Sequence, residues 1–319
     1  MRILNTLFVL LISISMLSAQ TVWTGAVDTD WNNPGNWNAG IPSTGVLATI
    51  SGSATNQPTY AGSTVLDFTI QNAGTLTFNT IIYNVGTIIN FGGATIINDD
   101  QIINAGSITF DNDGILNNNG TFDNYGSYDH AASAILNNAN GATFNSYGSF
   151  NSNGQINNDG LLNIEGSFSN SNGMTNNGTF AISGMASFPF GSNLDNNSGA
   201  QIDVQSGGTL DVNGNLNNDA AITVNGMLAV QSAAVLTNEA TITINNELDL
   251  GGMLVNNSTV TNNSLLNISS SGVLENNTNL SNSGTITIEI CGKLIQNAGN
   301  NIGGTIENGG LVYEITGTV

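Results

Sequence analysis

The chain has 319 residues, of which only 8% are charged, and its two basic residues face 22 acidic ones, for a formal net charge of −20. This balance excludes a nucleic-acid-binding surface, because phosphate contacts need Lys and Arg, and it argues against adhesion to anionic lipid. The hydrophobic content of 39% is too high, and the charged fraction too low, for an intrinsically disordered chain. Because Cys291 is the single cysteine, packing and backbone hydrogen bonds must replace internal disulfides.

Residues 1–20 predict a secretory signal peptide. Arg2 supplies a positive start, residues 7–17 form an apolar run too short to cross a bilayer, and Ala19 is a small residue suited to cleavage. An N-terminal membrane anchor is the alternative interpretation. We therefore expect a secreted protein with no membrane span once the signal is removed.

Residues 21–59 predict a cap at the N-terminal end of a repeat region. They contain all three tryptophans, Trp23, Trp31 and Trp37, and three of the four prolines. A segment rich in Trp and turns suits the open edge of a first coil, which would otherwise pair with other chains. A platform on which sugars stack is the alternative role of these tryptophans.

The run TVWTGAVDTDWNNPGNWNAGIPSTG at 21–45 carries the pattern W-x-G…D-W-N-N…N-W…G-x-P. This pattern resembles a short motif at the start of β-solenoid segments in secreted Bacteroidetes proteins and autotransporter-type passenger repeats. The resemblance implies a bacterial extracellular or cell-surface protein in which this segment leads into the solenoid.

An Asn pair or near-pair recurs through the region 60–319 in steps of 18 to 21 residues. The recurring positions are Asn98, Asn117, Asn137, Asn157, Asn176, Asn196, Asn217, Asn238, Asn256 and Asn276. Between them lie runs of 3–5 residues with alternating polarity, as in AQIDVQSGGTLDVNGNL at 200–216, and such alternation predicts short strands. Three strands fit in each repeat, so the sequence predicts an all-β, single-stranded right-handed parallel β-helix (β-solenoid) of about 20 residues per coil and about 12 coils. A propeller or a sandwich is the alternative, but these need longer repeats or strands.

Stacking of coils about 4.8 Å apart gives each residue an expected neighbour in the next coil. Asn at the coil corners is expected to form amide ladders, and Gly and Asn are expected to supply corners with positive φ. The segments FDNYGSY (122–128) and FNSYGSF (144–150) repeat one another, which predicts Phe122 over Phe144 and Tyr125 over Tyr147. Outward-facing tyrosines would form a candidate platform for a glycan ring, and core positions are the alternative.

Asp111, Asp113, Asp129 and His130 are the most concentrated group of ionisable residues. The same position in neighbouring coils should bring Asp111 and Asp129 within about 5–8 Å of each other. The run DNDG at 111–114 offers oxygen ligands and a Gly, although the other positions of an EF-hand loop are missing. The three acids are therefore candidate Ca²⁺ ligands, and His130 is a candidate ligand-binding residue beside the tyrosines. Solvated acids on a turn, or a general acid–base pair, are the alternatives.

The sequence predicts no catalytic residues. Lyases of β-helix type use Lys or Arg as the base, and polygalacturonase-like hydrolases combine an Asp trio with His and an Arg-x-Lys element, whereas this chain keeps only Lys293 after signal removal. His130 and Cys291 lie eight coils apart, roughly 38 Å, too far for a nucleophile and its base. The T-x-T pairs at 75–77 and 241–243 do not recur coil after coil in one column, so an ice-binding threonine array is not predicted.

We expect a non-catalytic, extracellular structural or adhesin-like β-helix that uses no cofactor and presents a surface to glycans or surface proteins. The alternative is a carbohydrate-binding module or a degenerate carbohydrate-active β-helix protein. Exposure of Tyr125 and Tyr147 beside the acids in one concave groove would favour the alternative. A smooth rod with short loops would favour the first expectation.

Overall fold

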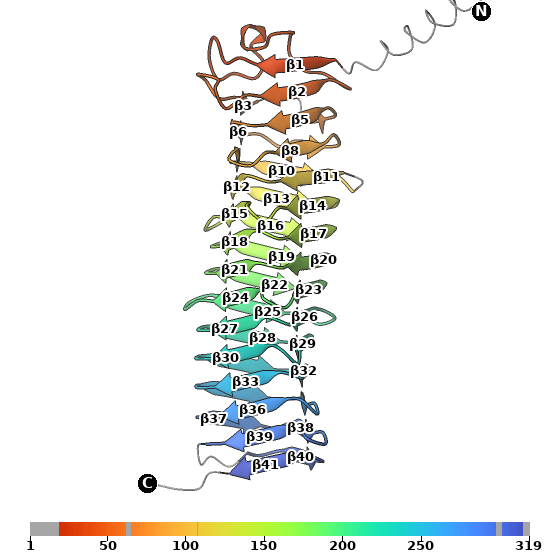
Figure 1. Ribbon diagram of the computed structural model, residues 1–319, viewed down its shortest axis with the longest axis vertical. Helices are drawn as coiled ribbons and strands as arrows, with labels where there is room; N and C mark the ends of the chain where they lie inside the picture. The colour runs from red at the N-terminus through yellow and green to blue at the C-terminus, as the bar shows by residue number, and fades with distance from the viewer. Residues whose placement is uncertain (1–18, 62–64, 107, 298–301, 315–319) are drawn as a thin grey trace, which may run out of the picture.

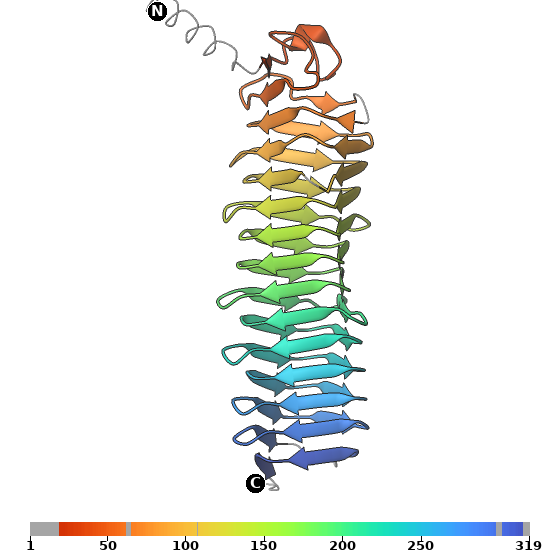
Figure 2. The same cartoon turned by 90° about the vertical axis from the view of Figure 1, so that its right-hand side faces the viewer.

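The computed structural model describes residues 19–61, 65–106, 108–297 and 302–314. Within these ranges the chain forms a straight all-β rod, a parallel β-solenoid of about 13 turns (Figures 1 and 2). Its one short helical turn in the described ranges is η1 (Pro34–Asn36), and none of the helical structure described there is long or apolar enough to cross a membrane. The predicted signal peptide, 1–20, lies outside the described residues except for its last two positions.

Most coils contribute one strand to each of three parallel sheets, called sheets A, B and C. Sheet A contains β1 (Gln20–Trp23), β2 (Leu47–Ile50), β5 (Thr69–Asn72), β8 (Ile88–Asn90), β11 (Thr109–Asn112), β14 (Ser127–His130), β17 (Ser149–Ser152), β20 (Ser167–Asn170), β23 (Met185–Phe188), β26 (Thr209–Val212), β29 (Met227–Val230), β32 (Glu247–Leu250), β35 (Leu265–Ile268), β38 (Thr285–Ile288) and β40 (Thr305–Asn308). Sheet B contains β3 (Thr59–Tyr60), β6 (Thr75–Phe78), β9 (Thr95–Asn98), β12 (Ile115–Asn118), β15 (Ile135–Asn138), β18 (Gln155–Asn158), β21 (Gly173–Asn176), β24 (Asn193–Asn196), β27 (Asn215–Asn218), β30 (Val235–Asn238), β33 (Met253–Asn256), β36 (Val273–Asn276), β39 (Lys293–Gln296) and β41 (Leu311–Glu314). Sheet C contains β4 (Val65–Leu66), β7 (Ile82–Asn84), β10 (Gln101–Asn104), β13 (Thr121–Asn124), β16 (Thr143–Ser146), β19 (Leu161–Ile164), β22 (Thr179–Ile182), β25 (Gln201–Val204), β28 (Ala221–Val224), β31 (Thr241–Ile244), β34 (Thr259–Asn262) and β37 (Asn279–Asn282).

The second and fourth residues of most strands point into the rod, because successive side chains of a strand alternate between its faces. Most second positions carry Leu, Ile, Val or an aromatic residue and form continuous apolar columns. The predicted stack of Phe122 on Phe144 is confirmed, with ring centroids 4.7 Å apart and planes 2° from parallel. Burial of these columns between coils is the main stabilising contribution, since a single coil cannot bury its own apolar face.

Many fourth positions carry buried asparagines that form an amide ladder inside sheet B. Its rungs are Asn98, Asn118, Asn138, Asn158, Asn176, Asn196, Asn218, Asn238, Asn256, Asn276 and Gln296. Each rung donates one side-chain N–H to the Oδ1 (or Oε1) of the next, at 2.6–2.9 Å, and most donate the other to a backbone carbonyl in sheet C. Apart from the Oδ1 of the first rung, Asn98, the ladder therefore satisfies buried amides that would otherwise destabilise the core.

Outward asparagines form further rows. Asn117, Asn137 and Asn157 precede inner rungs and are linked on the outer face of sheet B by side-chain hydrogen bonds of 2.8 Å. An Asn pair in the sequence thus places one amide inside the rod and one outside, because adjacent strand residues face opposite ways.

The expectation that corner glycines supply positive φ is wrong for most two-residue corners. Gly148 and Gly166 do not have positive φ, and a Cβ atom added at Gly166 would lie 2.1 Å from the carbonyl oxygen of Gly148. These corners need Gly because successive coils approach too closely for any side chain. Positive φ occurs instead in longer loops, at Gly141 (83°) and Gly199 (88°).

Tryptophans pack at the N-terminal end of the rod. Trp31 makes edge-to-face contacts with Trp37 and Tyr60, at centroid distances of 4.7 and 4.8 Å, and Trp23 packs beside them. The indole N–H of Trp23 donates to the Asn56 carbonyl (2.7 Å). All three tryptophans are buried, and β1 and β2 already belong to sheet A, so solenoid strands begin before residue 60.

Candidate functional site

The structure places Tyr125 and Tyr147 one above the other at the corner between sheets C and A, as the repeat predicted. Their rings stack with centroids 4.5 Å apart and planes 11° from parallel. Tyr125 is 50% exposed and Tyr147 is half-buried, so the pair lies on the surface rather than in the core. We call these two residues the tyrosine pair.

Carboxylates lie close to the tyrosine pair. Partial burial raises the pKa of the Tyr147 hydroxyl, and Tyr125 with the carboxylates Asp123 and Glu165 raises it further. Asp123 accepts hydrogen bonds from Gln101 Nε2 (2.6 Å) and Asn145 Nδ2 (2.8 Å) on the outer face of sheet C. The environment therefore keeps the Tyr147 hydroxyl protonated.

Sequence reasoning did not single out Asp123 or Glu165. The signal that could have found them is spacing: Asp123 lies two residues before Tyr125, and Glu165 occupies the corner position that follows Tyr147 in the next coil. Both residues carry negative charge beside the only stacked tyrosines described.

Asp111 and Asp129 are directly paired in register on neighbouring strands, β11 and β14. Their side chains share the outer face of sheet A, while Asp113 follows β11 at the corner. Burial raises the pKa of Asp111, and the charges of Asp113 and Asp129 raise it further. Asn151 Nδ2 donates to Asp129 Oδ1 at 3.0 Å.

This arrangement places Asp111 and Asp129 side by side on the outer face of sheet A, with Asp113 at the adjacent corner. Among the residues with a described position, no group of three or more His, Cys, Asp or Glu side chains is arranged to hold a metal ion. What the acids do create is like-charge repulsion on the face of sheet A.

His130 lies inside the rod, at the fourth position of β14, and is 1% exposed. It is therefore closed to an external ligand, although its neighbours in sequence face outward. His130 lies in the same inner column as Asn72, Asn90 and Asn112. The side-chain hydrogen bonds that link these asparagines stop at Asn112 and do not continue to the imidazole.

Neither nitrogen of the His130 ring has a hydrogen-bond partner of good geometry among the described residues. Burial lowers its pKa to about 4, and the nearby Ala134 carbonyl opposes that shift only in part. The ring is therefore neutral at pH 7. Cys291 is exposed and lies eight strand steps along sheet A, so the two residues cannot act as a dyad.

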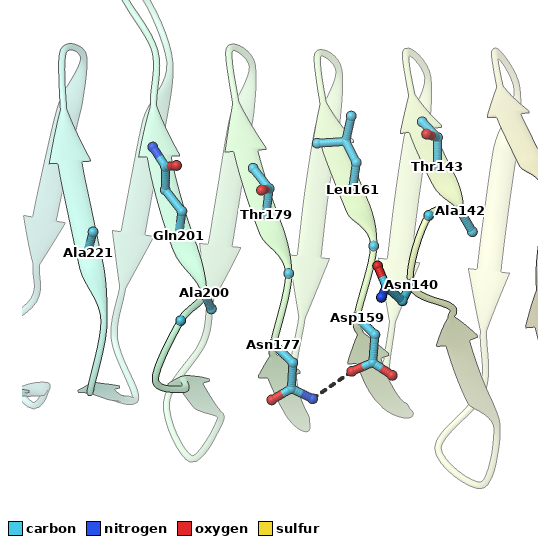
Figure 3. Close-up of a pocket in the computed structure, with 14 residues that line it drawn as sticks. Asn140, Ala142, Thr143, Asp159, Leu161, Asn177, Thr179, Ala200, Gln201 and Ala221 are labelled. Carbon is cyan, nitrogen blue, oxygen red and sulfur yellow. Dashed lines mark hydrogen bonds between the residues drawn. The ribbon is translucent and has the colours of Figure 1, made fainter.

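A shallow groove of about 480 Å³ lies over the corner between sheets B and C (Figure 3). The four-residue loops 139–142 and 197–200 bound it, and the coils between them turn with only two residues. Asp159 is its one ionisable lining residue, and it accepts a hydrogen bond of 2.6 Å from Asn177 Nδ2. Neither the tyrosine pair nor the acids of sheet A line this groove.

These features define the chain as an Asn-rich parallel β-solenoid with a stacked tyrosine pair at one corner and polar rows on its outer faces. No protein-family model, curated protein or solved structure matches it.

Proposed function

We propose that the chain is a non-catalytic structural or adhesin-like β-solenoid of a bacterial cell surface or extracellular matrix. The observation that carries this proposal is the straight rod itself, in which most turns are short and outward positions form repeating polar rows. Such a rod offers an extended contact surface at little conformational cost, because its side chains are already held in register. The large separation between His130 and Cys291 supports a role without covalent catalysis.

The apolar run at 7–17 and the tryptophan motif support the extracellular location. Export to the surface, and a relationship to secreted Bacteroidetes or autotransporter-type solenoids, form part of the proposal. The strongly acidic composition favours neutral or basic partners, such as glycans or surface proteins, over nucleic acid or anionic lipid.

Carbohydrate binding is the second candidate function, and the tyrosine pair favours it. Stacked, half-exposed phenol rings present an apolar face with hydroxyl groups at its edge, which suits a sugar ring. Asp123 and Glu165 beside the rings add acceptors for sugar hydroxyl groups.

A glycan array separates these candidates. The purified full chain is applied with calcium and with EDTA, together with the double variant Tyr125→Ala/Tyr147→Ala and the control Tyr83→Ala, which removes an exposed tyrosine of β7. Carbohydrate binding predicts retention that the double variant loses and the control keeps. Retention on no glycan would overturn the carbohydrate candidate.

Two further measurements test the leading proposal. Soluble polysaccharides incubated with the full chain should release no new reducing ends, and release of oligosaccharides would overturn a non-catalytic role. Labelled full chain should bind to whole bacterial cells or to immobilised matrix protein, and absence of binding to both would count against an adhesin-like role.

A further inference from the structure

The outer face of sheet C changes character toward the C-terminal end of the rod. Over β28, β31, β34 and β37 its outward positions are occupied only by small, uncharged residues. We call this surface the threonine face, and its members are Ala221, Thr223, Thr241, Thr243, Thr259, Thr261, Asn279 and Ser281.

Threonines in this face align from coil to coil. Thr241 pairs in register with Thr259, and Thr243 pairs with both Thr223 and Thr261. The sequence-based interpretation that T-x-T pairs do not recur in one column is therefore wrong here, because TVT at 259–261 continues TIT at 241–243. Variation in coil length hid the alignment, since these two strands start 18 residues apart while their neighbours start 20 apart.

The hydroxyl groups of this face are not used inside the protein. In the described part of the chain, the hydroxyl groups of Thr223, Thr241 and Thr243 make no hydrogen bond within the protein, and the same holds for those of Thr259 and Thr261. The asparagine side chains that reach Thr241 and Thr259 donate to the backbone carbonyls. All five side chains are exposed or half-buried. The hydroxyls are therefore free to bond to something outside the rod.

No charged side chain points outward from these four strands, although the chain is strongly acidic. In the same region sheet A presents Glu247 and Asp249, and sheet B presents Glu275. On sheet C the nearest acids lie at the margins: Asp203 in the preceding strand β25, and Asp219 and Glu239 at the corners before β28 and β31. The threonine face is thus a charge-free strip.

We propose that the threonine face binds ice. Neighbouring strands set hydroxyl rows about 4.8 Å apart, and alternate residues within a strand lie about 6.6 Å apart, so the face carries a two-dimensional lattice of hydroxyl and methyl groups. These repeats lie close to those of water oxygens in the planes of an ice crystal. Threonine is stiff at χ1, so the lattice is held in place before binding. Charged side chains, which would orient water differently, are absent from the strip.

Ice fits this face better than a crystalline polysaccharide does. Recognition of a flat sugar chain usually relies on stacking against aromatic rings, and the sequence contains no aromatic residue between Phe190 and Tyr313. Ice requires only matched hydroxyl and methyl positions. The proposed activity adds to a surface-binding role and does not depend on the tyrosine pair.

Ice-affinity partitioning of the purified full chain tests this proposal. A growing ice hemisphere should retain the wild-type chain above the level of an acidic control protein, and the chain should shape ice crystals under the microscope. The double variant Thr243→Lys/Thr261→Lys should lose retention and shaping. The matched control Thr237→Lys/Thr287→Lys adds the same charge on sheets B and A and should behave as the wild type.

Far-UV circular dichroism confirms that each variant folds. If the lysine variant does not fold, Thr243→Ser/Thr261→Ser, which removes only methyl groups, should reduce retention. Absence of wild-type retention would overturn the proposal, as would equal loss in both lysine variants. Binding to microcrystalline cellulose or chitin without binding to ice would assign the face to a polysaccharide instead.

Discussion

Replacement of an inner rung of the amide ladder should destabilise the rod far more than replacement of the asparagine next to it. Asn158 is fully buried, accepts from Asn138 Nδ2 (2.7 Å) and donates to Asn176 Oδ1 (2.7 Å) and to the Thr179 carbonyl (2.9 Å). Asn158→Leu leaves an amide hydrogen of Asn138 and the oxygen of Asn176 without partners. Each buried, unsatisfied group costs about 1–3 kcal/mol.

Burial of the leucine side chain offsets part of that loss, by about 1.5–3 kcal/mol. With the middle of each range, the two groups cost about 4 kcal/mol and the leucine recovers about 2 kcal/mol, so the net decrease in the free energy of unfolding is about 2 kcal/mol. Asn157→Leu is the matched control, because Asn157 is on the same strand but faces outward, where water can replace its hydrogen bonds. Its effect should stay within about 1 kcal/mol.

Urea unfolding followed by far-UV circular dichroism measures both changes as shifts of the transition midpoint. The expected result is a clear decrease for Asn158→Leu and a small change for Asn157→Leu. An Asn158→Leu chain as stable as the wild type would refute the view that the ladder stabilises the core. In that case the inner asparagines would be compatible with the fold without contributing to its stability.

Two titratable groups give further predictions. His130 has its folded pKa lowered from 6.5 to about 4, so the unfolded chain takes up a proton that the folded chain resists. Stability should fall by up to about 3 kcal/mol between pH 6.5 and 4, and His130→Asn should remove that part of the urea-midpoint decrease; parallel pH profiles would contradict the assignment. Asp111 has a raised pKa, so its favourable contribution is present at acid pH and is lost as the pH rises through that value. Asp111→Asn should therefore raise stability at pH 7 by about 0.2–1 kcal/mol, seen as a higher melting temperature, whereas Asp203→Asn, whose strand partners are Ala181 and Thr223, should not.

The repeat made most of the architecture predictable. Repeats of 18 to 21 residues that each contain three short alternating runs predict a coil with three strands, one in each of three sheets. The stacking of Tyr125 on Tyr147 followed from the similarity of two segments. The pairing of Asp111 with Asp129 followed from the same reasoning. Regular register carries this much information because each side chain meets the equivalent position of the next coil.

Orientation was harder to predict than register. Periodicity alone did not show that His130 faces inward, because a strand reverses its faces with a shift of one residue. The role of the corner glycines could not be predicted either. A Cβ atom at these positions would lie too close to a carbonyl oxygen of the preceding coil, and the amino-acid composition does not show such a close approach. The threonine face was missed because two similar segments are separated by a coil that is shorter than its neighbours.

Register between coils is the central claim, since every site described depends on it, and engineered disulfides test it most directly. In a Cys291→Ser background, Asn117→Cys/Asn137→Cys places the two Cα atoms on adjacent strands about 4.8 Å apart, within the Cα–Cα range of a disulfide. Asn117→Cys/Asn157→Cys places the Cα atoms two strands apart, about 9.6 Å, which is beyond that range. Mild oxidation followed by thiol counting should show a bond in the first pair and free thiols in the second. Free thiols in the first pair, or a bond within single chains in the second, would contradict the register.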